Sequence, residues 1–472
     1  MDFKNLLNRR YSIFIYIVCF LISVTILWQG RNYGLFPAPH PGMDQENFLR
    51  HAHLILQGNL PGYQYKLCPS YTLLMTLFYA LSGGKIIIMR ILQIALCSLI
   101  PVVIYKLCRR LRCSFQASQI AALIFCFYGP AILISISFLR AAPLGLCFLS
   151  FVYMLVRAFF SKKWYHYLIS GLLAGICILS RENFLPVVLC PAIMCIFPMV
   201  RKRVNWRQAG IYFCAIAALT VPVIIYNFIR FRSPEIIPGN VLHIFNFYHG
   251  EAATASSDKL ASSMLQRIPS QINLLLSSYE LPNSLSFFAH SDIISLLGFL
   301  IIPFNLLLAG TFVALFLDFK NKRTLFIGGM AAAYFMTLLF FTLFYRFRIP
   351  GVPLLCVLAG IAIHRLCQTK HYWKQITSIL IAILFTYFTY SSPNKLRTAS
   401  ERRSVIKLLI DNHEYTYAET LIDELIIDKK PLNKIHEYLM VTLYKNGNKQ
   451  EFKRLYDKYR PIITINKKVQ KK

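Results

Sequence analysis

Residues 11–29, YSIFIYIVCFLISVTILWQ, contain no charged side chain and are long enough to cross the apolar core of a membrane as a helix. Similar apolar stretches recur along most of the 472-residue chain, which is 56% hydrophobic and only 15% charged. An ordinary soluble domain carries about 25% charged residues. The sequence therefore predicts an all-α, polytopic membrane protein and excludes a soluble enzyme, a disordered chain and a secreted disulfide scaffold.

About eleven membrane spans are predicted from the apolar stretches. They lie near residues 11–29, 86–107, 117–137, 143–160, 166–180, 184–200, 209–229, 291–317, 324–344, 349–366 and 375–390. With the N-terminus inside, the six cytoplasmic segments hold twenty Lys and Arg and two acids. This asymmetry follows the positive-inside rule, so the net charge of +31 indicates membrane topology and not a nucleic-acid partner. Two large loops, 30–85 and 230–290, then face outward.

The last part of the chain, residues 391–472, is a different kind of sequence. It is polar, helical in pattern and repeats itself every 34 residues: Leu409 corresponds to Leu443 and Leu421 to Leu455. A period of 34 is typical of tetratricopeptide (TPR) repeats. We therefore expect two domains, a membrane domain over 1–390 and a small helical, TPR-like tail over 391–472. The tail is either docked on the membrane domain or a protein-contact module.

The first outward loop carries an acid next to a predicted amphipathic helix. Pro41-Gly42 breaks the chain, Asp44 opens the helix and Gly58 ends it, while Phe48, Ala52, Ile55 and Leu56 form one apolar stripe with Leu49 beside it. Such a helix is expected at the membrane surface. Asp44 is either an ordinary N-terminal helix cap or a general base on a hydroxyl group. Glu46 points to another face and is expected at most to assist, toward a substrate hydroxyl or a metal ion.

Basic residues at the outer surface run against the positive-inside tendency. Five map there: Lys66, Arg140, Arg181, Arg346 and Arg348. Each can be a residue that snorkels to lipid headgroups. Together they favour capture of a phosphate or diphosphate, because guanidinium groups bind phosphate bidentately. No Walker loop, zinc spacing or nucleophile elbow is present, and a metal site is not predicted, although a divalent metal stays possible.

Four stretches resemble the membrane glycosyltransferases of the GT-C fold. They resemble in particular the bacterial relatives of dolichyl-phosphate-mannose–protein mannosyltransferase (glycosyltransferase family 39) and the aminoarabinose transferases that modify lipid A. The stretches are PGMDQENFLRHAHLILQGNLPGYQYKLCPSYTLLM (41–75), LLAGICILSRENFLP (172–186), GNVLHIFNFYHGEAATAS (239–256) followed by YELPNS (279–284), and FYRFRIPGVPLL (344–355). Their order along the chain is the specific part of the resemblance.

The resemblance implies transfer of a sugar, a hexose or a pentose, from a polyprenyl-phosphate donor to a hydroxyl acceptor at the outer face, with inversion. Asp44 takes the place of the catalytic base and Lys66 that of a lysine at the lipid phosphate. Arg346 and Arg348 add to that phosphate site, and Arg181, Glu46 and Glu280 are further candidates for binding the donor. The implied location is the bacterial inner membrane, with the site toward the periplasm or exterior. The next outward loop, SISFLRAAP (135–143), lacks the family's frequent second acid, which puts metal binding in doubt.

Two other functions remain open on the sequence. One is a lipid-linked saccharide polymerase or ligase, which usually carries its chemistry in a large late loop. The other is a lipid or polysaccharide translocase, which needs charged groups along a central path and an alternating-access repeat. The early loop with Asp44 favours the transferase.

Overall fold

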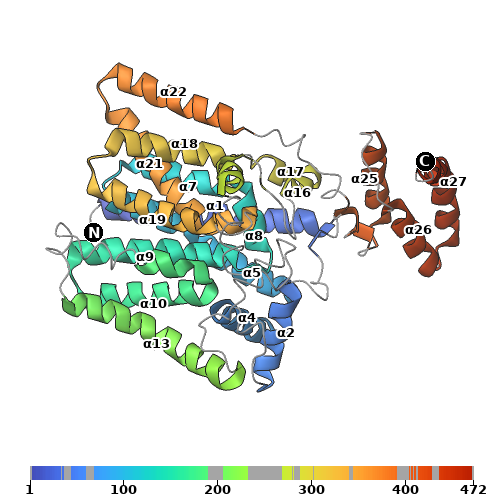
Figure 1. The fold of residues 1–472 in the computed structure, drawn as a ribbon, viewed down its shortest axis with the longest axis horizontal. Helices are drawn as coiled ribbons and strands as arrows, with labels where there is room; N and C mark the ends of the chain where they lie inside the picture. The colour runs from blue at the N-terminus through green and yellow to red at the C-terminus, as the bar shows by residue number, and fades with distance from the viewer. Residues whose placement is uncertain are drawn as a thin grey trace. The chain divides into compact units, whose positions relative to one another are not determined.

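The computed structural model describes most of the chain as helices (Figure 1). The described residues are 3–32, 35–36, 44–59, 68–189, 206–231, 268–278, 280, 287–300, 302–339, 344–390, 403, 405–407, 409–410, 413–427 and 435–469. Over these residues there is no strand, and the expected all-α fold is confirmed. Five helical stretches are long and apolar enough to cross a membrane: Arg10–Asn32, Ile86–Arg110, Ala141–Ser161, Trp206–Arg230 and Tyr345–Gln368. Three shorter apolar helices accompany them, so the chain is a polytopic membrane protein.

The chain divides into two compact units, which we describe separately. Unit 1 comprises Met1–Val24, Ala38–Leu285 and Phe299–Ser391. Its helices are α1 (Phe3–Asn32, whose last turns belong to unit 2), α2 (Asp44–Leu56), α4 (Pro69–Ser82), α5 (Ile86–Cys97), α6 (Leu99–Arg110), α7 (Phe115–Cys126), α8 (Gly129–Ile136), α9 (Ala141–Ser161), α10 (Trp164–Ser180), η1 (Glu182–Phe184), α13 (Trp206–Phe231), a helix over 268–276, α18 (Phe304–Asp318), α19 (Lys322–Leu338), α20 (Tyr345–Arg348), η2 (Ile349–Gly351), α21 (Val352–Gln368) and α22 (Tyr372–Thr389).

Helix α21 forms the centre of unit 1. Every residue from Val352 to Ala362 is buried, and α6, α7, α9, α18 and α19 pack around it. A helix that is apolar on all sides is suited to such a central position. Its start is set by Pro350 and Pro353, since proline fits the first turn of a helix, where its missing N–H costs nothing.

One of the predicted spans is interrupted at a proline. The range 117–137 is divided into α7 and α8, because Pro130 lacks an amide hydrogen and begins a new helix. The freed backbone groups at this break are paired with the chain before α18: Gly129 N–H donates to the Leu300 carbonyl at 3.2 Å, and Ile302 N–H donates to the Phe127 carbonyl at 3.5 Å. Such pairing is required of a break at membrane depth.

The predicted span 291–317 is wrong as a single helix. Its first part forms two short helices, α16 (Phe287–Ile293) and α17 (Ser295–Gly298), and α18 begins only after Pro303. Proline cannot donate the hydrogen bond that would continue a helix through this point. Of the predicted span 184–200, residues 190–200 lie outside the described part.

The amphipathic helix predicted after Pro41-Gly42 is α2. It packs against α4, where Phe48 meets the ring of Tyr71 edge-on with centroids 4.7 Å apart. On the predicted apolar stripe, Phe48 and Ala52 are buried against the protein, whereas Leu56 is 46% exposed. Cys68, just before α4, is also buried and donates from Sγ to the Ser180 carbonyl at 3.3 Å, so α4 and the end of α10 are joined.

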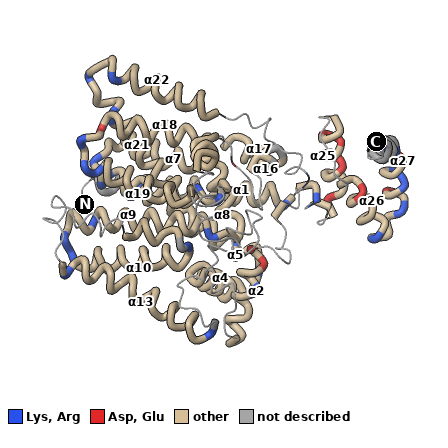
Figure 2. Tube along the Cα trace, viewed as in Figure 1, with Lys and Arg blue, Asp and Glu red and all other residues tan. Residues whose placement is uncertain are grey.

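Basic residues gather at one end of unit 1, at left in Figure 2. The turns between α6 and α7, α9 and α10, α18 and α19, and α21 and α22 carry them, and these are the segments predicted to face the cytoplasm. Helix α2, which begins at Asp44, lies at the other end of unit 1 (Figure 1). The segments that follow α8 and α10 lie at that end as well.

Unit 2 comprises Thr25–Pro37, Ser286–Gly298 and Ser392–Lys472. Its tail contains α25 (Tyr415–Ile427), α26 (Ile435–Lys445) and α27 (Lys449–Val469). The period of 34 recurs in the backbone, because His413 N–H donates to the Ile410 carbonyl as Gly447 N–H does to that of Tyr444, each at 3.1 Å. His413 and Gly447 also share a positive φ, +65° and +78°. The assignment to the TPR class stays a prediction.

Candidate active site

The centre of the candidate site is an ion pair between two segments far apart in the sequence. Arg346 Nη1 lies 3.1 Å from Asp44 Oδ2, and both residues belong to unit 1. Asp44 is the first residue of α2, and Arg346 lies in α20, the short helix that leads into α21. The Asp44 side chain is 55% exposed and that of Arg346 only 14%, so the carboxylate is accessible while its partner is held in the protein. The structure thus joins two of the residues singled out from the sequence.

Arg181 approaches the same short helix through an aromatic ring. Its guanidinium lies 3.8 Å from the ring centroid of Phe347, and that of Arg346 lies 5.2 Å from the same ring. The two guanidinium groups therefore share Phe347 as a platform, an arrangement that places positive charge near the Asp44 carboxylate. Phe347 was not among the predicted site residues, although its place between two arginines in FYRFR was a usable signal.

The backbone around this platform is fixed from two helices. The Tyr334 hydroxyl, on α19, donates to the Phe347 carbonyl at 2.6 Å. Asn183 Nδ2 donates to Thr337 Oγ1 at 3.2 Å and ties the RENFLP segment to the same helix. Phe184 is fully buried beside Tyr334. Contacts with α19 therefore hold both the segment that follows Arg181 and the backbone next to Arg346.

One donor of Arg346 has no partner among the described residues. The Nε atom is buried and makes no hydrogen bond there. A buried unsatisfied donor is costly and uncommon in folded proteins.

Arg348 and Glu280 are buried and hold one another. Arg348 Nη1 is 3.5 Å from Glu280 Oε2, and the side chains are 0% and 3% exposed. Tyr128 donates from its hydroxyl to Glu280 Oε1 at 2.6 Å, a partner that the sequence did not suggest. Arg348 also donates to the Leu274 carbonyl and, at 3.3 Å, to that of Ser277.

These contacts give Arg348 a structural role, because it donates hydrogen bonds to carbonyl groups at the end of helix 268–276. Burial raises the pKa of the Glu280 carboxyl, and the neighbouring Arg348 and the Tyr128 hydroxyl oppose that shift. Binding of the donor by Arg348 or Glu280 stays a prediction.

The remaining predicted residues are placed as follows. Glu46 pairs with Arg50 one turn along α2, at 3.7 Å, and so holds a different arginine from Asp44. Arg140 donates from Nη1 to the Ser180 carbonyl at 2.8 Å, at the end of α10. Lys66 lies outside the described residues. Within the described part of the chain, no group of three or more His, Cys, Asp or Glu side chains is arranged to hold a metal ion.

The chain is similar to a known family over about a third of its length. Residues 66–226 match the family model described as dolichyl-phosphate-mannose-protein mannosyltransferase. The match includes the segment LLAGICILSRENFLP and confirms the resemblance to these enzymes. Among curated proteins, none matches the chain.

Two solved structures are similar to the chain at low sequence identity. One is the archaeal oligosaccharyltransferase AglB from Archaeoglobus fulgidus, in complex with an inhibitory peptide and a dolichol-phosphate: the TM-score is 0.49 and the identity 14%, over 87% of this chain and 59% of that chain. The other is ArnT from Cupriavidus metallidurans bound to undecaprenyl phosphate: the TM-score is 0.47 and the identity 17%, over 91% of this chain and 74% of that chain. This chain therefore spans about three fifths of the length of AglB.

Proposed function

We propose that this protein is a membrane glycosyltransferase that moves a sugar from a polyprenyl-phosphate donor to a hydroxyl acceptor at the outer face of the membrane. The observation that carries the proposal is the ion pair between Asp44 and Arg346 beside the Arg181–Phe347 platform. It combines an accessible carboxylate with buried positive charge. The match to the protein mannosyltransferase family over residues 66–226 supports the donor class.

Asp44 is assigned the role of general base. Its carboxylate accepts the proton of the acceptor hydroxyl while that oxygen attacks the anomeric carbon of the sugar. The bond from the anomeric carbon to the phosphate oxygen breaks, and the polyprenyl phosphate leaves with the bonding electrons. A single displacement of this kind inverts the configuration and requires one carboxylate, unlike hydrolysis of a glycoside, which uses two.

Arg346 and Arg181 are assigned to the leaving phosphate. Negative charge develops on that group in the transition state, and positioned cations stabilise it more strongly in a site that excludes water. In the structure Arg346 Nη1 lies 3.1 Å from Asp44 Oδ2, so the cation is already placed beside the carboxylate that takes up the proton.

The site contains no evident metal-binding group in the described residues, and no step of this scheme passes through a metal. The two carboxylates on α2 each hold an arginine instead. The transfer assay described next also identifies the sugar, a hexose or a pentose, and the acceptor.

The test uses purified full-length protein in lipid nanodiscs with a panel of radiolabelled polyprenyl-phosphate sugars. We expect Asp44→Asn to lower transfer or release of sugar by about 10²- to 10⁴-fold, the usual range for loss of a general base. Asparagine is as good as aspartate at a helix N-terminus, so the fold is expected to persist. The control is Arg50→Gln, an exposed substitution on the same helix.

Two results would contradict the proposal. Equal turnover in wild type and Asp44→Asn would leave Asp44 as a helix-terminal residue and place the base elsewhere. Failure of folded wild type to transfer any sugar, combined with lipid translocation that Asp44→Asn abolishes, would identify a translocase.

A further inference from the structure

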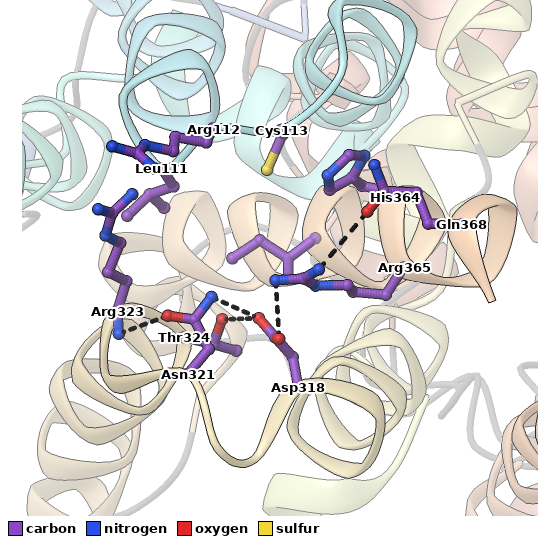
Figure 3. A pocket seen from close by; sticks show the side chains of 11 residues that line it. Leu111, Arg112, Cys113, Asp318, Asn321, Arg323, Thr324, His364, Arg365 and Gln368 are labelled. Atoms are coloured by element: carbon purple, nitrogen blue, oxygen red, sulfur yellow. Dashed lines mark hydrogen bonds and ion pairs between the residues drawn. The ribbon is translucent and has the colours of Figure 1, made fainter.

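A polar cavity lies at the opposite end of unit 1 from Asp44, at the end that carries the basic turns. Its volume is about 410 Å³, and Figure 3 shows the side chains that line it. They come from the turn after α6, from the turn between α18 and α19, and from the last two turns of α21. The positive-inside rule assigns this end to the cytoplasm. Nothing in the proposed transfer reaction uses this cavity.

One wall of the cavity is an ion pair whose acid is fully engaged. Asp318 Oδ1 lies 2.9 Å from Arg365 Nη2. Its other oxygen accepts from Asn321 Nδ2 at 2.8 Å and from the Thr324 hydroxyl. Asp318 is therefore held by three donors, and its charge is matched by Arg365.

Two further arginines line the cavity, and among the described residues that line it Asp318 is the only carboxylate. Arg112 is exposed, and its backbone has a φ of +72°, in the left-handed region. The guanidinium of Arg323 lies 4.6 Å from the ring centroid of Phe160. In Figure 3 the guanidinium groups of Arg112 and Arg323 lie on one side of the cavity, and that of Arg365 lies on the other. The cavity is consequently positive, with arginine on both sides.

The ends of α18 and α19 that contribute lining residues also carry exposed apolar side chains. Phe319 and Leu325, next in sequence to the lining residues Asp318 and Thr324, are 59% and 48% exposed. Exposed apolar side chains on a membrane helix contact acyl chains. A ligand that places an anion in the cavity and an apolar part against α18 and α19 fits both surfaces.

We propose that this cavity binds the phosphate group of an anionic phospholipid from the cytoplasmic leaflet. Basic pockets between membrane helices on the cytoplasmic side suit acidic lipid headgroups, because that leaflet carries negative charge. The cavity has the size of an ordinary small-molecule site. Arg112 and Arg323 would contact the phosphate, while the pair Asp318–Arg365 keeps the opposite wall in place.

The test measures thermal stability and bound lipid in detergent-purified full-length protein. Phosphatidylglycerol or cardiolipin is added, with phosphatidylcholine as the neutral lipid. We expect the anionic lipids to raise the Tm of wild type on the order of 5 °C, as for a ligand well above its Kd. Native mass spectrometry is expected to show an anionic lipid retained on the protein. Both effects should be lost in Arg112→Gln with Arg323→Gln.

The matched control is Lys320→Gln with Lys370→Gln, which removes two exposed cations from the same end without touching the cavity. Arg112→Gln alone changes an exposed side chain, so it tests the site if the double variant fails to fold. Equal lipid effects in all variants would overturn the proposal and leave only general surface charge. A shift with inorganic phosphate or glycerol phosphate as large as with lipid would overturn the lipid source and assign the cavity to a soluble phosphate.

Discussion

At the scale of single residues, the contrast between Arg346 and Arg348 shows how position divides two similar side chains. They are two residues apart in FYRFR, yet Arg346 meets an exposed carboxylate and Arg348 a buried one. The first pair is suited to chemistry because it is accessible. The second is suited to stability because both of its side chains are buried, and a buried charge needs its partner.

Removing the guanidinium of Arg346 is predicted to impair the reaction more than the fold. Arg346→Gln is expected to lower turnover about 10²-fold at saturating donor, because a positioned donor to the leaving phosphate is lost. Arg346→Lys should recover part of it, since lysine supplies the charge without the planar fork. Steady-state kinetics with a polyprenyl-phosphate sugar measure both. An unchanged kcat in Arg346→Gln would remove the residue from the phosphate site.

Removing Arg348 alone is predicted to destabilise the protein. Arg348→Met leaves the Glu280 carboxylate buried without its cation, which costs about 3–5 kcal/mol. Glu280→Gln with Arg348→Met should recover most of that loss, since no uncompensated charge then remains. Thermal unfolding in detergent compares the single and double variants. If both lose the same stability, the pair is not what holds this part of unit 1 together.

At the scale of elements, close approach of helices depends on glycine. Gly171 and Gly175 lie four apart on α10, the small-xxx-small spacing that lets membrane helices pack closely. A Cβ on Gly171 would lie 2.4 Å from the Tyr212 carbonyl oxygen of α13. A backbone carbonyl cannot move aside as the end of a flexible side chain can. An added Cβ would therefore force α10 and α13 apart.

Gly171→Ala is therefore predicted to loosen the packing of α10 on α13 and lower the Tm by several degrees. The control is Gly210→Ala on α13, where an added Cβ meets nothing within 4 Å. That change should be neutral or slightly stabilising, because alanine is the better helix former. Thermal unfolding of both variants decides. A Gly171→Ala protein as stable as the control would show that α10 and α13 do not need this contact.

At the scale of the whole molecule, membrane orientation connects the two proposed sites. The transfer site lies at the end of unit 1 that contains Asp44, and the lipid site lies at the end that contains the basic turns. The positive-inside rule requires these ends to face opposite sides of the membrane.

Single cysteines are predicted to be labelled from opposite sides. Arg50→Cys should react with a membrane-impermeant maleimide added to intact spheroplasts, and Lys320→Cys only in inverted vesicles. Both side chains are exposed. The background is a chain in which serine replaces Cys214 and Cys367, which are exposed among the described residues, and also Cys190 and Cys195, which lie outside them. Labelling of both new cysteines from one side would contradict the orientation and move the transfer site to the other face.

The sequence by itself determined the class of protein. Long uncharged stretches such as 11–29 force helices in lipid, and the apolar stripe between Pro41-Gly42 and Gly58 indicated the amphipathic helix that is α2. It also indicated Asp44, Arg181 and Arg346 as chemistry-bearing residues. These inferences depend on local composition and periodicity, which the sequence contains directly.

Only the tertiary structure decided which of these residues meet. Asp44 and Arg346 are 302 positions apart, and no local pattern encodes that pairing. The same holds for Tyr128 with Glu280, and for the breaks at Pro130 and before α18, whose backbone groups are satisfied by each other's segments. Hydrogen bonds and ion pairs between distant helices depend on how those helices pack, and packing is a property of the assembled fold.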